Sequence, residues 1–245
     1  GMSVEHVDTV VIGAGVVGLA VGLARAPAAR AERRSPGLAR LAEVEWAQVS
    51  AGFQHTCAVP VGGALYCWGS NIFGALGVGN SVISSHVPVR VGGASNWTSV
   101  SAGGQHPGAR RATGRLYCWG GDDDGQLGGD PDLERQYRPT EVNGSLTNWA
   151  SVSAGDRHTC ARKATGRLFC WGGDGPLGLL GDDEALVDRP TPVQVSGRSA
   201  NWASVEAAGG HTCARKTNGR LFCWGSDLYG ALGDGPGESG SGHVP

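Results

Sequence analysis

From residue 44 onward, apolar positions alternate with small polar ones in short runs that end at glycine or at a polar turn. The third such group, over residues 148–173, reads NWASVSAGDRHTCARKATGRLFCWGG. Within it, Trp149–Ala154 alternates large and small residues, which is the pattern of a half-buried β-strand. Residues 157–163 and 167–171 predict two more strands, separated by Ala164-Thr165-Gly166. The pattern therefore predicts three consecutive antiparallel strands.

The same pattern occurs four times, which makes the chain a repeat protein. Each copy opens with a tryptophan, and the openings lie 51, 52 and 53 residues apart, at Trp46, Trp97, Trp149 and Trp202. Each copy closes with a second tryptophan at the same spacings, at Trp68, Trp119, Trp171 and Trp224. All four copies place glycine last in the short loop, where a left-handed residue closes a three-residue hairpin with a bulge.

A fourth strand is expected in each copy after a loop of variable length. In the third copy it covers residues 191–195, and residues 87–91 and 140–142 match it in earlier copies. Prolines in this segment suit an outer edge strand, because a missing N–H there costs no ladder hydrogen bond. Four short antiparallel strands in each repeat of about 50 residues form one blade of a β-propeller. The sequence therefore predicts an all-β chain of four-stranded antiparallel blades.

The repeat motif W-x-x-V-x-A-G-x-x-H-T-C-A, followed by G-x-L-x-C-W-G and G-x-L-G, recurs over residues 44–245. It resembles the regulator-of-chromosome-condensation repeat, in its bacterial form rich in tryptophan and cysteine. That resemblance implies a seven-bladed propeller, whereas four copies are visible here, over residues 44–95, 96–147, 148–200 and 201–245. We therefore expect an incomplete propeller, an open arc of about four blades. Further blades or another chain would complete its ring.

The first 43 residues carry a different motif. Residues 7–26 read VDTVVIGAGVVGLAVGLARA, which is an apolar run, then G-x-G-x-x-G, then a helical pattern of small residues. Strand, glycine motif and helix in this order form the dinucleotide-binding fingerprint. The stretch resembles the start of flavin-dependent amine and hydroxy-acid oxidases. That resemblance implies FAD as a cofactor, with Gly13, Gly15 and Gly18 as the candidate binding residues.

The remainder of a nucleotide-binding unit is missing, because no second apolar strand ending in an acidic residue follows. We therefore expect residues 1–43 to be a β-α remnant and linker that binds no cofactor. One alternative is a secretory signal or anchor over the uncharged residues 9–24. Another is a fragment or fusion of a flavin-dependent oxidoreductase that carries only the first βα unit.

Six of the seven cysteines form pairs that are ten residues apart: Cys57 and Cys67, Cys160 and Cys170, Cys213 and Cys223. With a three-residue loop, Cys160 lies directly opposite Cys170, where Cβ atoms are about 4.5–5.5 Å apart. Cys118 has no partner, because Gly108 replaces the other cysteine. We expect three disulfides, which would indicate an extracellular or cell-envelope location, and buried free thiols are the alternative. No second pair lies at C-x-x-C spacing, so no metal site is expected.

One histidine recurs in each copy ahead of the first cysteine position, at His55, His106, His158 and His211. A catalytic histidine would need a nucleophile or an acid recurring beside it, and the sequence has none there. We expect each histidine to bond the backbone of the adjacent blade. We expect the repeated tryptophans to pack within and between blades, because large aromatic side chains supply much of the buried area. No residue is therefore assigned a catalytic role.

Composition and charge narrow the function further. The chain has 43 Gly and 12 Pro, and its hydrophobic content of 40% is enough for a core. A net charge of −2 with no long basic run argues against a nucleic-acid partner. The repeat region lacks an apolar run of about 18 residues, so no membrane span is expected there. Acidic runs at residues 122–124 and 182–184 lack the alternating spacing of a calcium loop and indicate a solvated rim.

The resemblance extends to eukaryotic proteins that act as nucleotide-exchange factors for a small GTPase and bind chromatin, but no residue motif for either activity is identifiable here. We expect a non-enzymatic protein-interaction scaffold, because function on such folds lies in loops held by a rigid frame. The loops expected to contact an unidentified protein partner cover residues 70–85, 121–138 and 173–189.

Overall fold

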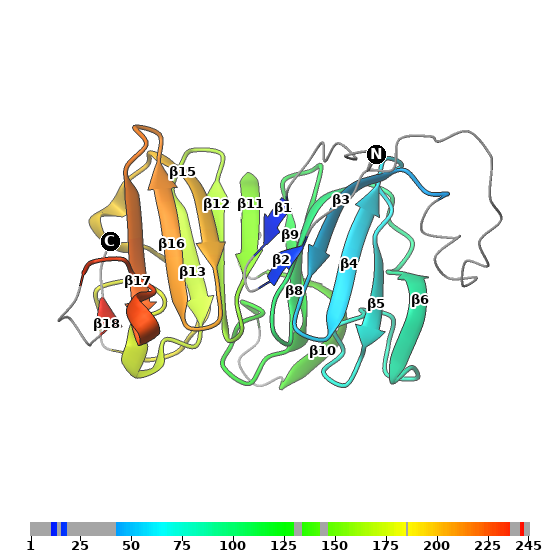
Figure 1. Cartoon of the computed structure of the whole chain (residues 1–245). Coiled ribbons are helices and arrows are strands. Elements are labelled where there is room, and N and C mark those ends of the chain that lie inside the picture. Colours follow the sequence, from blue (N-terminus) through cyan, green and yellow to red (C-terminus); the bar gives the residue numbers. More distant parts are fainter. Residues whose placement is uncertain are drawn as a thin grey trace, which may run out of the picture.

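The computed structural model describes residues 11–13, 16–18, 43–129, 134–142, 147–184, 186–235 and 241–242. Four of its sheets each contain four antiparallel strands, and another is a two-stranded hairpin. In each four-stranded sheet the strands follow the order of the chain, from an inner strand that begins at the opening tryptophan to an outer edge strand. Figure 1 shows the four sheets in chain order, from the cyan blade at one end to the orange blade at the other. The predicted all-β arc of about four blades is confirmed.

The strand boundaries agree closely with the repeat pattern. Blade 1 consists of β3 (Trp46–Ala51), β4 (His55–Pro60), β5 (Tyr66–Ser70) and β6 (Ser84–Arg90). Blade 2 consists of β7 (Trp97–Ala102), β8 (Pro107–Arg111), β9 (Leu116–Gly121) and β10 (Arg135–Glu141). Blade 3 consists of β11 (Trp149–Ala154), β12 (His158–Lys163), β13 (Leu168–Gly172) and β14 (Arg189–Gln194). Blade 4 consists of β15 (Trp202–Ala207), β16 (His211–Lys216), β17 (Leu221–Ser226) and β18 (Ser241–Gly242).

Three short 3-10 helices lie in the connections, η1 (Gly175–Leu177), η2 (Ser196–Arg198) and η3 (Leu228–Gly230). The outer strands of blades 1 to 3 begin earlier than the sequence pattern predicts, for example at Arg189 instead of residue 191. No helix among the described residues is both long enough and apolar enough to cross a membrane.

The hairpin between the second and third strands has the predicted register. Cys160 pairs with Cys170, and Arg162 pairs with Leu168, which leaves a short glycine-closed loop. Gly166 has φ +81°, and a Cβ at this position would lie 2.3 Å from the carbonyl oxygen of Ala200. Glycine is therefore required both by the backbone conformation and by the close approach of the next blade.

Equivalent connections lie at the same end of the arc, because all four blades have the same strand order. The hairpins between second and third strands lie at one end, which we call the hairpin end (upper in Figure 1). The connections between first and second strands, and the long loops between third and fourth strands, lie at the opposite end. We call this the loop end.

The apolar core lies between neighbouring blades. One buried cluster joins Leu65 and Leu76 of blade 1 to Trp97 and Trp119 of blade 2. A second cluster joins blades 2 and 3, and a third joins blades 3 and 4. Each blade therefore buries its face only when the next blade packs against it, as expected of repeat proteins.

Blade 4 shows what happens to this face when no described blade follows. Leu221 is 67% exposed, whereas the equivalent residues Leu65, Leu116 and Leu168 are at most 1% exposed. Among the described residues, no blade covers this face of blade 4.

Near the N-terminus, the described part of the expected β-α unit forms two short strands. Val11–Gly13 forms β1 and Val16–Gly18 forms β2, and the two strands pair antiparallel with Val11 opposite Gly18. The sequence predicts a turn into a helix here, so this prediction is wrong for residues 16–18. Gly13 and Gly18 thus belong to a hairpin that lies beside β3. Gly15 and the predicted helix that follows lie outside the described residues.

Candidate binding surface at the loop end of the blades

The closing tryptophans join each blade to the long loop of the preceding one. The indole Nε1–H of Trp119 donates to the carbonyl oxygen of Ala75 at 2.9 Å. Trp171 and Trp224 make the equivalent hydrogen bonds, to Gln126 at 3.0 Å and to Leu179 at 2.9 Å. The opening tryptophans of blades 2 to 4 are at most 3% exposed, and each meets an aromatic ring of its own blade edge to face, at Tyr117, Phe169 and Phe222. In blades 2 to 4 both sets of tryptophans therefore pack within and between blades.

Two of the four recurrent histidines, His106 and His158, bond a hydroxyl group of the next blade, where the sequence predicted a bond to its backbone. Nε2 of His106 lies 2.7 Å from Oγ1 of Thr159 in the next blade, and that hydroxyl donates to the carbonyl of Gln126 at 2.8 Å. His158 and Thr212 repeat the arrangement at 2.8 Å. Because the single hydroxyl proton goes to the carbonyl, the histidine must donate from Nε2.

Burial keeps these histidines neutral. It lowers the pKa of His106 to about 3 and that of His158 to about 4, from an ordinary value of 6.5. Burial likewise lowers the pKa of His55 to about 4. His55 has a buried Nε2 without a partner, because Pro107 stands where the next two blades have a threonine. His211 is only partly buried, on blade 4.

A serine of each inner strand contributes a third link between blades. Oγ of Ser50 accepts the backbone N–H of Ala102 at 2.9 Å, and Ser101 and Ser153 do the same for Ala154 and Ala207. In blade 4 Glu206 occupies this position. The tryptophan and serine contacts recur at all three interfaces, and the histidine–threonine contact recurs at the two interfaces that blade 3 makes.

Each long loop is shaped by one Asn or Asp within two residues of the end of the third strand. Oδ1 of this residue accepts the N–H of the leucine in the G-x-L-G motif in all four blades, in the pairs Asn71–Leu76, Asp122–Leu127, Asp174–Leu180 and Asp227–Leu232. Sequence reasoning missed this role, because it interpreted the acidic run after blade 2 as solvated rim. The constant spacing of five or six residues ahead of the leucine is the signal that identifies it.

A cavity of about 570 Å³ opens at the loop end, beside blades 1, 2 and 3. Its apolar lining includes Phe53, Ile72 and Phe73, of which Phe53 is 78% exposed and Ile72 is 57% exposed. The side-chain amides of Gln54 and Gln105 also line it and have no hydrogen-bond partner among the described residues. Such a combination of apolar wall and unpaired polar groups is typical of a binding pocket.

One charged pair borders this cavity. Arg157 donates from Nε to the carboxylate of Asp124 at 2.8 Å, and this contact raises the pKa of the guanidinium further. The contact joins the first connection of blade 3 to the long loop of blade 2.

Of the three loops expected to contact a partner, residues 70–85 line the cavity directly, through Ser70, Ile72, Phe73 and Ala75. The other two lie further along the same end.

The six paired cysteines face each other across the hairpins of blades 1, 3 and 4. Their sulfur atoms lie at disulfide distance, between 2.09 and 2.12 Å, and the pairs are those of the sequence pattern: Cys57 with Cys67, Cys160 with Cys170, and Cys213 with Cys223. In each hairpin the two cysteines are also directly opposed in the strand register.

The second blade departs from this arrangement. Cys118 is a buried free thiol, and burial together with Asp122 raises its pKa. Among the described residues, no group of three or more His, Cys, Asp or Glu side chains could hold a metal ion.

Blades of four antiparallel strands, packed through repeated tryptophan and histidine–threonine contacts, define a propeller-type repeat protein. The chain belongs to the family of the regulator of chromosome condensation (RCC1) repeat. Two family descriptions of this repeat match it, one over residues 62–109, 113–162 and 165–215, the other over residues 46–75, 97–126 and 202–231. The matches begin at the first opening tryptophan, and neither includes β1 or β2.

Individual relatives share this repeat region. The ultraviolet-B receptor UVR8 of Arabidopsis thaliana is 35% identical over 191 residues, which cover 76% of this chain and 42% of the receptor. The mouse regulator of chromosome condensation is 31% identical, over 84% of this chain and 48% of that protein. The crystal structure of yeast RCC1 (Prp20) bound to Kap60 superposes with a TM-score of 0.70 at 23% identity, over 83% of this chain and 48% of that one. The chain thus spans less than half the length of each of these relatives.

Proposed function

We propose that this chain is a non-enzymatic protein-interaction scaffold, which binds a protein segment at the loop end of its blades. The observation that carries the proposal is the cavity at this end, with two strongly exposed apolar side chains, Phe53 and Ile72, at its wall. Exposed apolar groups beside polar ones that lack partners favour a ligand that buries an apolar side chain and bonds the amides.

The rigid frame supports this proposal. The cavity is built from the short connections of three blades and the long loop of blade 1, and interblade hydrogen bonds hold these segments in place. A pocket that is already formed needs little ordering when a ligand binds. Yeast RCC1, which has the same fold, has been crystallised bound to Kap60, so the fold is compatible with a protein partner.

The three cysteine pairs favour an oxidising location for this scaffold, extracellular or in the cell envelope. All six paired cysteines lie on the inner hairpins of their blades, away from the loop-end cavity. Their proposed role is to strengthen each blade.

A random 12-residue peptide library selected against the folded protein would test the proposal. We expect enriched peptides to carry an aromatic or aliphatic anchor. We expect their affinity, measured by fluorescence anisotropy, to fall about tenfold in Phe53→Ala and Ile72→Ala, because each change removes part of the apolar wall. Both side chains are largely exposed, so their loss should leave the fold intact.

The matched control is Val61→Ala, which removes an exposed apolar group (64% exposed) at the hairpin end. Peptide affinity should stay within twofold of the parent in this variant. The proposal would be refuted by selected peptides that bind all three variants equally well, or by peptides whose affinity depends on Val61 and not on Phe53.

A further inference from the structure

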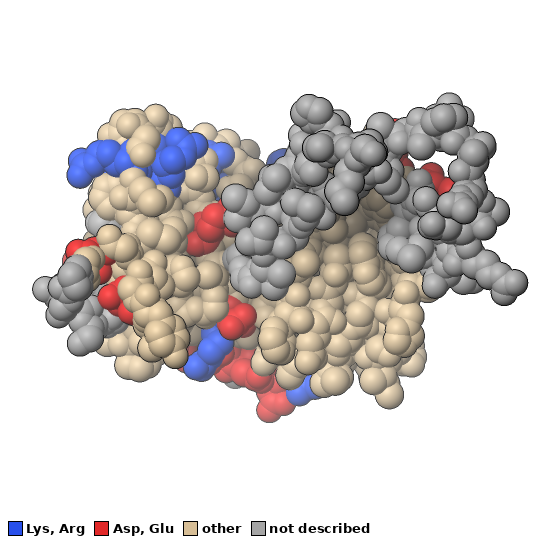
Figure 2. Space-filling view, in the orientation of Figure 1, with Lys and Arg blue, Asp and Glu red and all other residues tan. Residues whose placement is uncertain are grey.

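In blades 2 to 4, cations gather in the hairpins and acidic residues gather in the long loops. The hairpins of blades 2 to 4, residues 110–115, 162–167 and 215–220, carry nine cations and no acidic residue. The loop-end segments 121–129 and 173–188 carry eight acidic residues and no lysine or arginine among their described positions. Figure 2 shows Lys and Arg gathered at the hairpin end over blade 4. A net charge of −2 therefore conceals a strongly basic hairpin end.

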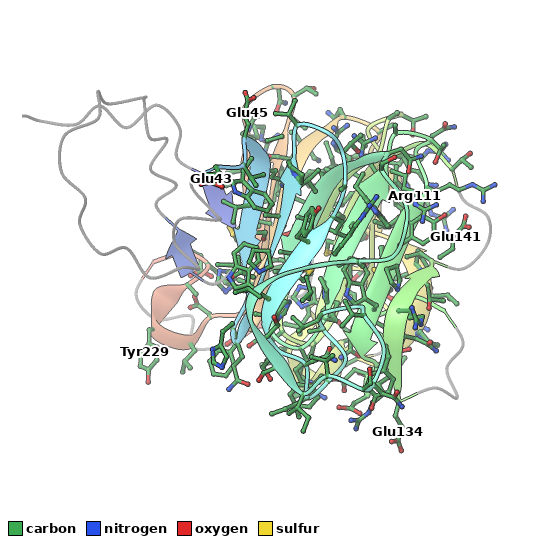
Figure 3. The ribbon with its side chains drawn as sticks, turned by 90° about the vertical axis from the view of Figure 1, so that its right-hand side faces the viewer. Glu43, Glu45, Arg111, Glu134, Glu141 and Tyr229 are labelled. Carbon is green, nitrogen blue, oxygen red and sulfur yellow. A yellow bond between two sulfur atoms is a disulfide. The ribbon has the colours of Figure 1, made fainter. Side chains whose placement is uncertain are left out.

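The cations of the hairpin end form rows that repeat from blade to blade. One row stacks on the opening tryptophans: Arg111 lies 4.6 Å from the ring centre of Trp97, and Lys163 lies 3.8 Å from that of Trp149. Lys216 lies 4.7 Å from the ring of the fourth opening tryptophan. These cation–π contacts hold the charges in defined positions. Figure 3 shows Arg111 at this end of the molecule and Glu134 at the other.

A second row consists of Arg115, Arg167 and Arg220, directly after the hairpin glycines. In blade 2 this arginine already holds a carboxylate, because Nη1 of Arg115 donates to Glu141 at 3.2 Å. Glu141 lies opposite Tyr117 in the outer strand, and Gln194 has the same place opposite Phe169 in blade 3. Arg167 and Arg220 have no ion pair among the described residues, although Arg220 lies over the ring of Phe222, 5.3 Å from its centre.

One contact within the chain shows what an arginine of the hairpin end binds. Seven of the nine cations are arginines, and Arg115 of blade 2 binds a carboxylate through a single hydrogen bond to Glu141. The tips of these hairpins contain only Ala, Thr, Asn and Gly between the cations, so they offer no exposed aromatic ring on which a base could stack. The unpaired arginines of blades 3 and 4 are thus placed to accept carboxylates from outside.

We propose that the hairpin end of blades 2 to 4 is a second binding surface, which takes an acidic polypeptide segment through Arg167 and Arg220. Successive carboxylates of the segment bind successive blades. The row of arginines recurs with the repeat, and an acidic segment presents its charges in a row as well. This surface is separate from the loop-end cavity, so the two can be tested independently.

The test uses the whole chain and a fluorescein-labelled 12-residue peptide that alternates Glu and Gly. Anisotropy should show saturable binding at 50 mM NaCl, and the affinity should fall several-fold at 200 mM NaCl because the contacts are exposed ion pairs. The double variant Arg167→Gln/Arg220→Gln should weaken binding about 3- to 10-fold. The control Arg135→Gln/Arg138→Gln makes the same change in net charge away from this surface and should change affinity less than twofold.

A further variant, Gln194→Glu, keeps every arginine but supplies an internal carboxylate for Arg167, as Glu141 does for Arg115. It should weaken peptide binding about as much as losing Arg167 alone. Three outcomes would overturn the proposal: no saturable binding at 50 mM NaCl, equal losses in the two double variants, or much tighter binding of a 12-nucleotide oligothymidine or a DNA duplex. The last result would make nucleic acid the partner. Phe53→Ala should bind the acidic peptide as tightly as the parent chain does, since Phe53 lies at the loop end.

Discussion

Replacing Pro107 by threonine should stabilise the interface between blades 1 and 2. Pro107 pairs with Ala102 in the same register in which Thr159 pairs with Ala154 and Thr212 with Ala207. A threonine at this position would place its hydroxyl beside Nε2 of His55, which is 4% exposed as a residue and lacks a partner at that atom. The same hydroxyl would then donate to the carbonyl of the blade 1 loop, as Thr159 does to Gln126 in the next interface.

The size of the effect follows from two opposing contributions. Giving a partner to a buried unsatisfied donor is worth about 1–3 kcal/mol. Losing proline increases the freedom of the unfolded chain, which costs about 0.4–1 kcal/mol. Pro107→Val incurs the second contribution without the first, since valine has the shape of threonine but no hydroxyl. The threonine and valine variants should therefore differ by about 1–3 kcal/mol in the free energy of unfolding, with threonine the more stable.

Urea unfolding followed by tryptophan fluorescence would measure this difference, and thermal unfolding should show it as roughly 2–4 °C for each kcal/mol. The reverse change, Thr159→Val, removes the partner of His106 and should lower stability by about 1–3 kcal/mol. Equal unfolding midpoints for Pro107→Thr and Pro107→Val would refute the assignment of the threonine hydroxyl as the link between histidine and loop.

Two more predictions concern the same interfaces. Gly108→Cys should form a fourth disulfide, because Gly108 faces Cys118 in the register of the other pairs. The number of free thiols, titrated in denaturant without reductant, should fall from one to none. Closing this loop should add up to about 3 kcal/mol, less the cost of moving Val152, whose Cγ2 lies 2.9 Å from the new Cβ. Acid should destabilise the chain. His106 and His158 have pKa values of about 3 and 4 in the folded state, and about 6.5 in the unfolded state. The stabilisation that comes from their neutral rings is therefore complete above pH 6.5 and is lost as the pH falls toward 4. Between pH 7 and pH 5 each should cost about 2 kcal/mol, and a urea midpoint that stays constant over this range would contradict their burial as neutral rings.

Predictions from the sequence succeeded for features that are determined by residues within a single blade. The glycine-closed hairpin sets the register of the second and third strands, so the pairing of Cys160 with Cys170 could be predicted from loop length alone. The alternation of Trp149–Ala154 likewise predicted the inner strand at its observed bounds. These features depend on residues a few positions apart, whose geometry is set by the local backbone.

Predictions failed where the partner lies elsewhere in the fold. The sequence could not show that His106 bonds the hydroxyl of Thr159, because those residues are 53 positions apart and meet only when two blades pack. It also placed Val16–Gly18 in the glycine motif of a dinucleotide fingerprint, whereas these residues pair as a strand with Val11–Gly13. Valine favours strands.

The sequence by itself determined the blade: its four strands, its glycine-closed hairpin, its paired cysteines and its repetition. The tertiary structure decided what stacking of blades does to those residues. It turned a histidine, a threonine and a tryptophan from neighbouring repeats into one hydrogen-bonded link, and it left Leu221 exposed where no described blade follows. It also brought the cations of three hairpins to one end and the acidic segments of the long loops to the other, because every blade points the same way. Strand order within a repeat is a local property, whereas burial, pairing and charge depend on which repeat lies beside it.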